Sequence, residues 1–168
     1  SLVFKSLEHG KPSLDGYRLS FNLTHSSGVA LIAVGGCNIG QVGVDIETLD
    51  RSVDALGIAR RFFNQAEYEA LEIMDVDRHQ VEFMKLWVLK EAYLKALGCG
   101  LSGGMSNFHV QMKGGGSVLV SGQEQWGDVS SWVMRSFSVQ EGYVAGLAIS
   151  HHSDFINYFD YPSAGVAS

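Results

Sequence analysis

Apolar and polar residues alternate along the first part of the chain in a way that predicts β-strands. Residues 20–26 and 29–35 show this two-residue period, and Gly28 is the turn residue between them. At 41–47, every second residue from Val42 onward is apolar. This alternation predicts a third strand with one face turned toward a core.

A period close to four residues replaces the alternation in the middle of the chain. It predicts short helices at 54–63 and 65–74 and a long helix from about 77 to 97. Gly98 follows the last apolar residue of the long helix and fits a left-handed cap at its end.

After a glycine-rich loop at 98–104, the chain returns to strand patterns. The predicted strands are 108–112, 117–120, 131–139 and 143–150. Strands joined by short turns most simply pair antiparallel. The sequence therefore predicts an α+β fold in which a long helix packs on an antiparallel sheet.

The composition is that of a globular protein with one domain or two small halves. Of 168 residues, 46% are hydrophobic and 18% are charged, and the formal net charge is −6. This acidic balance argues against nucleic acid or an anionic membrane as the main partner, and the sequence shows no apolar run long enough for a membrane span. Cys37 and Cys99 fit neither a disulfide framework nor a paired-cysteine metal site, so we expect reduced thiols in a cytoplasmic protein.

Charged side chains interrupt two of the apolar elements. Asp45 and Glu47 are two residues apart on a predicted strand, so both carboxylates leave the same face. On the long helix, a four-residue stripe that contains Trp87 ends with Glu91 and Lys95. Three carboxylates that converge from a strand and a helix would suit Mg²⁺, which takes oxygen ligands and shares its shell with water and substrate phosphates.

The same charges also have an ordinary structural explanation that the pattern leaves open. Asp45 and Glu47 fit the solvent side of a half-exposed strand. Glu91 and Lys95 are in the favoured i, i+4 order of a helix-surface ion pair, which typically contributes about 0.2–0.5 kcal/mol.

Five motifs occur in an order that resembles a known family. They are GKP at 10–12, NLTHS at 22–26, GVDIE at 43–47, RFF at 61–63 with Glu67, and WxxKEAxxK at 87–95. The set is similar to the signature of the 4′-phosphopantetheinyl transferases, and it is more similar to the surfactin-synthetase-activating type than to the short trimeric holo-carrier-protein synthases. The resemblance implies a fold of the 4′-phosphopantetheinyl transferase type.

The resemblance also implies a reaction. It is the Mg²⁺-dependent transfer of 4′-phosphopantetheine from coenzyme A to a serine of an apo acyl or peptidyl carrier protein, with release of 3′,5′-ADP. Asp45, Glu47 and Glu91 are then the metal ligands. Glu91 is also the candidate general base toward the serine hydroxyl, and Lys95 would compensate charge on the pyrophosphate. The motifs leave the carrier protein and its pathway open.

Other motif residues would contact the nucleotide end of coenzyme A. By resemblance, His25 contacts the 3′-phosphate, and Thr24 or Ser26 adds a hydroxyl. Gly10 and Lys11 would lie near the adenine end. From the residues alone, His25 and Lys11 equally fit structural positions.

Lys90 and Glu67 complete the set of motif residues. Lys90 lies about 100° round the helix from Glu91, so it would face another part of the nucleotide or another carboxylate. Glu67 would have a structural role near the site, together with the RFF motif.

Enzymes of the surfactin type consist of two similar halves with coenzyme A between them, and this sequence resembles the second half. We therefore interpret residues 1–12 as the remnant of an N-terminal half or linker, 13–150 as the phosphopantetheinyl transferase domain, and 151–168 as an irregular tail. Three explanations stay open: the sequence is truncated, the absent segment is disordered, or another copy of the chain supplies that face. The last of these predicts self-association.

Two other functions also stay open. A metal-dependent nuclease or phosphohydrolase combines acidic residues with lysine, but restriction-type nucleases carry these residues on a strand, whereas Glu91 and Lys95 lie on a predicted helix. The acidic balance also argues against nucleic acid. A non-catalytic fragment that binds carrier proteins would not need the three carboxylates and Lys95 together.

Overall fold

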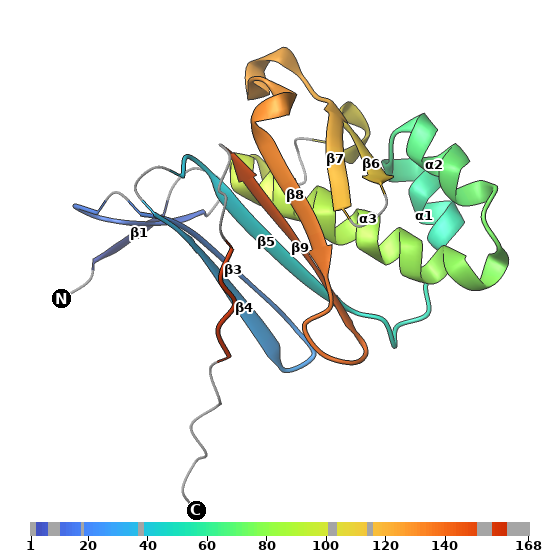
Figure 1. Ribbon diagram of the computed structural model, residues 1–168, viewed down its shortest axis with the longest axis horizontal. Coiled ribbons are helices and arrows are strands. Elements are labelled where there is room, and N and C mark those ends of the chain that lie inside the picture. Colours follow the sequence, from blue (N-terminus) through green and yellow to red (C-terminus); the bar gives the residue numbers. More distant parts are fainter. Residues whose placement is uncertain are drawn as a thin grey trace, which may run out of the picture.

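One long helix lies along a five-stranded antiparallel sheet, and this pair forms the centre of the structure (Figure 1). The computed structural model describes residues 3–6, 11–17, 19–36, 39–100, 104–113, 116–150 and 156–160. The long helix is α3 (Val76–Leu97), and Gly98 caps it at a φ of 72° as predicted. In spatial order, the sheet consists of β5 (Val42–Thr48), β9 (Tyr143–Ser150), β8 (Trp132–Phe137), β7 (Gly116–Ser121) and β6 (His109–Lys113).

Two glycines let α3 lie directly on β5 and β9. A Cβ atom at Gly43 would be 2.0 Å from the Ala92 carbonyl oxygen, and one at Gly146 would be 2.4 Å from the Val88 carbonyl oxygen. Neither approach is possible for a real side chain, so only glycine permits this contact. Gly146 pairs with Asp45 across the two strands, which places the close contact beside the charged face of β5.

The main core lies between α3 and the sheet. Leu89, Ala92 and Ala96 of the helix are 0% exposed. Tyr93 packs edge-on against Trp132 with 4.7 Å between the ring centroids. Because full burial of a large apolar side chain contributes about 1.5–3 kcal/mol, this face of α3 is sufficient to hold the helix on the sheet.

A separate hairpin, β3 (Ser20–Ser26) and β4 (Val29–Gly35), lies beside β5. The Asn22 side-chain oxygen accepts a hydrogen bond from the Val44 backbone N–H at 2.9 Å, which ties β3 to β5. Leu31 of β4 packs on a second buried apolar cluster, which consists of Val42, Val44, Leu147 and Ile149. The hairpin therefore covers β5 on the side away from the main core.

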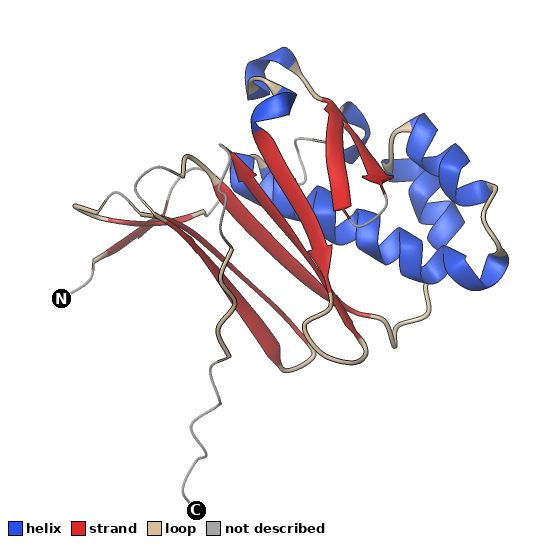
Figure 2. Ribbon diagram, viewed as in Figure 1, coloured by secondary structure: helices blue, strands red, loops and turns tan. Residues whose placement is uncertain are grey.

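Two short helices, α1 (Ala55–Phe62) and α2 (Gln65–Glu72), gather at one end of the structure and contact α3 (Figure 2). Asp54 caps α1 by accepting a backbone hydrogen bond at 3.0 Å. Asn64 and Glu67 form a capping box at the start of α2, so both helices begin where the sequence provides a cap.

The fold confirms the predicted α+β class, with a long helix on an antiparallel sheet. The ends of the predicted strands and helices shift by a few residues at most.

The hairpin of β1 (Phe4–Ser6) and β2 (Pro12–Leu14) was not predicted, and the boundary proposed after residue 12 falls inside β2. Short 3₁₀ helices in the described residues, at Met105–Asn107, Glu124–Trp126 and Val129–Ser131, were also not predicted. Of the predicted tail, the structure describes 156–160, which has no regular secondary structure. In the described part of the chain, no helix combines the length and apolar character needed to cross a membrane.

Candidate active site

Polar side chains of β3, β5 and α3 meet where the hairpin lies against the main sheet. Asp45 and Glu47 of β5 are contacted from β3 by Thr24 and Ser26, respectively. Lys95 reaches Asp45 from α3. Charged groups of a strand and a helix therefore meet, whereas the predicted convergence of three carboxylates on one metal ion stays a prediction.

Asp45 is the centre of this group and is only 5% exposed. Its Oδ1 atom accepts hydrogen bonds from Lys95 Nζ at 2.5 Å and from Thr24 Oγ1 at 3.1 Å. Lys95 Nζ also donates to Thr24 Oγ1 at 3.1 Å. Burial raises the pKa of Asp45 above its ordinary value, although Lys95 and Thr24 act to lower it. The environment is therefore too apolar for one ion pair to compensate fully.

The second oxygen of Asp45, Oδ2, is buried and has no hydrogen-bond partner among the described residues. A buried carboxylate oxygen without a partner is energetically costly and rare in proteins. This atom is therefore the point in the site that would gain most from a bound cation.

Glu47 lies two residues after Asp45, on the same face of β5, and is half-buried. Burial, and then repulsion from Asp45, raises the pKa of Glu47. Ser26 Oγ donates a hydrogen bond to Glu47 Oε2 at 3.4 Å, and this bond together with the charges of Arg51 and Lys95 acts in the opposite direction.

Glu91 is the third carboxylate. Burial is the largest cause that raises the pKa of Glu91 to about 7, and the charges of Asp45 and Glu47 add to it, whereas Lys95 lowers it. A carboxyl group with a pKa near 7 can both release and accept a proton at neutral pH. The three carboxyl groups together resist ionisation more than isolated ones would.

The ordinary structural explanation does not hold for Asp45 or for a surface ion pair of Glu91 with Lys95, whereas the half-buried Glu47 still fits it. Asp45 is buried rather than on a solvent-facing strand surface. Lys95 pairs with Asp45, and the ion pairs found among the described residues do not include one between Lys95 and Glu91.

His25 lies on the other face of β3 from Thr24 and Ser26. Successive side chains point to opposite faces of a strand, and His25 is exposed and pairs with Ala30 of β4. Thr24 and Ser26 instead face the carboxylates. The prediction that one of these hydroxyls joins His25 at the same phosphate stays a prediction, in which the phosphate would have to reach both faces at the end of β3.

Lys11 lies at the C-terminal end of α3. Its Nζ donates hydrogen bonds to the Ala96 carbonyl at 2.5 Å and to the Val42 carbonyl at 3.3 Å, and burial lowers its pKa. Lys11 lines a cavity of about 520 Å³, together with residues that include Phe21, Gln41 and Gly98. Its contact with a nucleotide stays a prediction, and the predicted contact by Gly10 lies outside the described residues.

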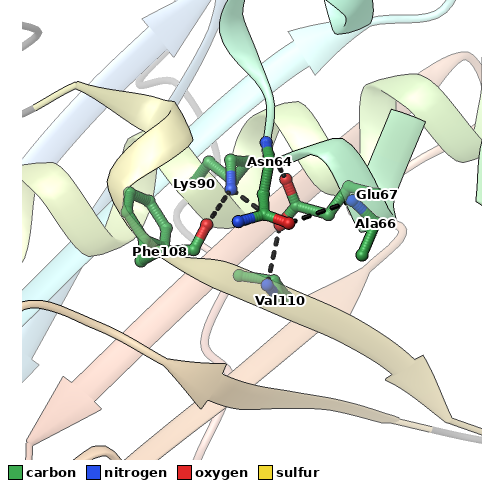
Figure 3. A network of polar contacts seen from close by, with 6 residues as sticks. All are labelled: Asn64, Ala66, Glu67, Lys90, Phe108 and Val110. Atoms are coloured by element: carbon green, nitrogen blue, oxygen red, sulfur yellow. Dashed lines mark hydrogen bonds and ion pairs between the residues drawn. The ribbon is translucent and has the colours of Figure 1, made fainter. Parts of the chain in front are cut away.

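The sequence left two alternatives for Lys90: a contact with the nucleotide or a contact with another carboxylate. Lys90 is buried away from the surface, so the first alternative is corrected. Its side chain is 0% exposed and pairs with Glu67 at 2.7 Å (Figure 3). Burial lowers the pKa of Lys90 to about 8, although the charge of Glu67 raises it. The other alternative, that Lys90 faces a carboxylate, is confirmed.

The chemical type of these side chains suits Mg²⁺, but their arrangement does not form a ready-made metal site. In the described part of the chain, no three His, Cys, Asp or Glu side chains are arranged ready to hold a metal ion. The ammonium of Lys95 lies on Asp45 instead. The donor set nevertheless suits a hard divalent cation, because it offers three carboxylates with raised pKa values and an unpartnered oxygen.

Comparison with known proteins identifies the family. Residues 41–148 match the profile of the 4′-phosphopantetheinyl transferase superfamily, which is more than half of the chain. The chain belongs to this superfamily.

Similar proteins of this superfamily are longer than the chain. The 4′-phosphopantetheinyl transferase HetI from Nostoc is 43% identical over 84 residues, which cover 50% of this chain and 35% of HetI. The 4′-phosphopantetheinyl transferase Sfp from Bacillus subtilis strain 168 is 30% identical over 149 residues, which cover 88% of this chain and 63% of Sfp. The chain thus spans between about a third and two thirds of the length of these relatives.

A solved structure shares the fold. The holo-(acyl-carrier-protein) synthase from Bacillus anthracis strain Ames, solved in complex with coenzyme A (3′,5′-ADP), superposes with a TM-score of 0.53 at 19% identity and covers 68% of this chain and 98% of that one. At this identity the likeness shows the fold alone. It agrees with the fold predicted from the motifs.

Three features of the candidate site were missed by sequence reasoning. The signal for Thr24 and Ser26 was present, because the alternation of β3 puts them on the face opposite His25. The partner of Lys90 had no such signal, because the Asn64 to Glu67 spacing indicates only a capping box within α2. Arg51, which acts on Glu47 from the loop after β5, had none.

Proposed function

We propose that this chain carries the catalytic centre of a Mg²⁺-dependent 4′-phosphopantetheinyl transferase, which acts on coenzyme A and an apo acyl or peptidyl carrier protein and releases 3′,5′-ADP. The observation that carries the proposal is the buried contact between Asp45 and Lys95, with Glu47 and Glu91 facing it. Membership of the superfamily supports this reading, and so does coenzyme A in the related synthase from Bacillus anthracis.

In this reaction, the serine oxygen of the carrier bonds to the phosphorus that carries pantetheine, and the bond from that phosphorus to the 3′,5′-ADP oxygen breaks. Such transfers depend mainly on positioning and on neutralisation of charge. Lys95 supplies a cation that is 30% exposed and anchored by Asp45 and Thr24. Its role is to compensate the charge that develops on the leaving phosphate.

Glu91 takes the proton of the serine hydroxyl. Without a metal, the pKa of Glu91 is raised to about 7; a cation bound beside it would lower this pKa, so Glu91 would be ionised and would act as a weak base. The same carboxyl group gives the proton to solvent after the carrier has been modified.

Asp45, Glu47 and Glu91 would hold Mg²⁺. When bound, the metal polarises the pyrophosphate and neutralises its charge. The unpartnered Oδ2 atom of Asp45 supports this assignment, and so do the raised pKa values of the three carboxyl groups.

His25 and Lys11 are our candidates for contacts to the nucleotide end of coenzyme A. His25 is exposed at the edge of the site on β3. Lys11 lines the cavity at the C-terminal end of α3. Thr24 and Ser26 donate hydrogen bonds to Asp45 and Glu47, so a contact of either hydroxyl with a phosphate would replace its bond to the carboxylate.

The outer face of the β3–β4 hairpin is our candidate for contact with a second copy of the chain. Leu23, Ile32 and Val34 lie on this face and are 50%, 72% and 65% exposed. Adjacent exposed apolar side chains of this size mark an interaction surface. A second copy is the partner available to the isolated chain.

The proposal is tested by the release of 3′,5′-ADP from coenzyme A in the presence of an apo carrier protein. We expect release that requires both the carrier and Mg²⁺ and that stops when a chelator is added. Release without the carrier would instead indicate the hydrolase considered from the sequence. No release under any of these conditions would contradict the proposal.

A further inference from the structure

A buried ion pair joins Lys90, the residue before Glu91 on α3, to Glu67 of α2. The contacts of this pair do not include the residues that we assign to the reaction. Lys90 Nζ and Glu67 Oε1 are 2.7 Å apart, and the two side chains are 0% and 1% exposed. Lys90 also donates a hydrogen bond to the Phe108 carbonyl at 2.9 Å, and its Nζ lies 4.0 Å from the centroid of the Phe108 ring. The ammonium group is therefore enclosed by protein on several sides.

Glu67 joins three elements through this network, as Figure 3 shows. Its Oε1 atom accepts hydrogen bonds from Lys90 of α3 and from the Val110 backbone N–H of β6, both at 2.7 Å. Its Oε2 atom accepts a hydrogen bond from the Asn64 backbone N–H at 2.9 Å, at the start of α2. Both oxygens are satisfied, so the network fixes α2, β6 and α3 relative to one another.

Stability alone does not account for such a pair. Removal of two charges from water is costly, and a buried ion pair can often be replaced by apolar side chains of similar volume without loss of stability. The pair instead allows only one relative position of α2 and α3, because neither charge tolerates the loss of its partner in a buried site.

The position of Lys90 on α3 shows that the pair acts on the rotation of this helix about its axis. Val88 and Ala92 lie on the glycines of β9 and β5. With about 100° per residue, Lys90 is about 160° round the helix from each of them. The helix is thus held on two opposite sides, and Glu91 lies between these sides.

We propose that Lys90 and Glu67 are positioning residues, whose ion pair fixes the rotation of α3 about its own axis and so the direction of Glu91 toward the carboxylates of β5. Neither side chain touches a reactant. The predicted effect on the rate rests on the proposed function, whereas the predicted effect on the helix does not.

The test replaces both partners at once, so that no buried charge is left alone. We compare the wild type with the double variant Lys90→Met/Glu67→Met. The matched control, Lys85→Met/Glu82→Met, removes an ion pair of the same helix in which Lys85 is one third exposed. The readouts are thermal unfolding, hydrogen exchange of the backbone amides of residues 88–96, and kcat and KM for coenzyme A.

We expect the double variant to fold but to unfold below the wild-type temperature, because the Val110 and Asn64 N–H groups and the Phe108 carbonyl lose a partner, with amide exchange at 88–96 at least about 10-fold faster than in the wild type. We expect kcat to fall about 10- to 100-fold, as for a misplaced catalytic group, with KM for coenzyme A within about 2-fold of the wild type. The control should behave as the wild type in all three readouts.

Unchanged exchange at 88–96 in a folded double variant would overturn the proposal, and so would an unchanged kcat. If the wild type shows no transfer, the proposed function fails, and the exchange comparison alone still decides whether the pair positions α3. If the double variant does not fold, Lys90→Met/Glu67→Gln takes its place, because the amide oxygen introduced by Glu67→Gln can still accept the hydrogen bond from the Val110 N–H and no buried charge is left alone. A folded variant of this kind with wild-type exchange would then overturn the proposal.

Discussion

At the scale of single residues, the site is a cluster of carboxyl groups in which the cost of burial exceeds the compensation by the charge of Lys95 and the hydrogen bonds of the hydroxyl groups. The pKa values of Asp45, Glu47 and Glu91 are all raised, with burial as the largest cause in each case. Lys95 is the one cation that forms an ion pair with this cluster among the described residues. Removal of a carboxylate and removal of the lysine should therefore have opposite effects on stability.

Glu91→Gln should stabilise the protein at pH 8 in buffer with a chelator. The pKa of Glu91 is raised from 4.5 to about 7 in the folded state, so between these pH values the folded protein retains a proton that the unfolded chain has released. The free energy of unfolding of the wild type therefore falls as the pH rises through this window. With allowance for solvent screening of this partly exposed side chain, the variant should gain about 1–2 kcal/mol above pH 7 and nothing near pH 4.

Denaturant unfolding at several pH values measures this difference. The exposed Glu124→Gln is the control, and it should show no such pH dependence. A difference that is independent of pH would contradict the cause assigned to the raised pKa of Glu91.

Lys95→Ala should lower the rate of transfer in a single turnover about 100-fold, as does removal of one preorganised donor at a site of developing charge. It also leaves Asp45 buried without its cation, so we expect lower stability at neutral pH. Lys85→Ala, on the same helix, is the control. An unchanged single-turnover rate would show that Lys95 only supports the fold.

At the scale of elements, the strand, helix and fold-class predictions succeeded because they rest on periodicity, which is local. The alternation at 42–47 and the stripe that ends in Glu91 and Lys95 indicated both the elements and the face that carries the charges. The partner of each charge was not predictable, because Lys95 meets Asp45 and Lys90 meets Glu67 across the fold rather than along the helix. The hairpin of β1 and β2 also escaped prediction, since three-residue strands are too short for a period.

Gly43→Ala should disrupt the contact between α3 and β5. The added Cβ atom would be 2.0 Å from the Ala92 carbonyl oxygen and 2.5 Å from the Ala96 backbone nitrogen, neither of which can move alone. We expect a loss of about 3 kcal/mol or more in the free energy of unfolding, at the upper end for overpacking.

Gly36→Ala is the matched control, because a Cβ atom there has no neighbour within 4 Å. Its free energy of unfolding should stay within about 0.5 kcal/mol of the wild type. Equal stability of the two variants would contradict the close approach of helix and strand.

At the scale of the whole molecule, the β3–β4 hairpin presents an apolar outer face on which Leu23, Ile32 and Val34 are exposed, while Phe4 of β1 packs on Phe21 at one end of it. This face adjoins the site, since His25 lies on it and Thr24, the preceding residue, contacts Asp45. The relatives HetI and Sfp are longer than the chain. A further protein surface on this face would therefore lie next to the candidate nucleotide contacts.

The isolated chain should self-associate through this face. Sedimentation velocity at increasing concentration should show a rise in mean mass for the wild type and a shift toward the monomer for Ile32→Glu. Ile73→Glu, at a position that is 86% exposed on another part of the molecule, is the control and should associate as the wild type does. A wild type that is monomeric at all concentrations would contradict the assignment of this face.

The most direct test of the account is the intact mass of an apo carrier protein after incubation with coenzyme A, Mg²⁺ and this chain. We predict that the carrier gains one phosphopantetheine group, that a carrier without its acceptor serine gains none, and that a folded Asp45→Ala variant leaves the carrier unmodified. A carrier left unmodified by the wild type would contradict the central claim. Full modification by Asp45→Ala at saturating Mg²⁺ would contradict it equally, because the reaction would then not depend on the carboxylate at the centre of the site.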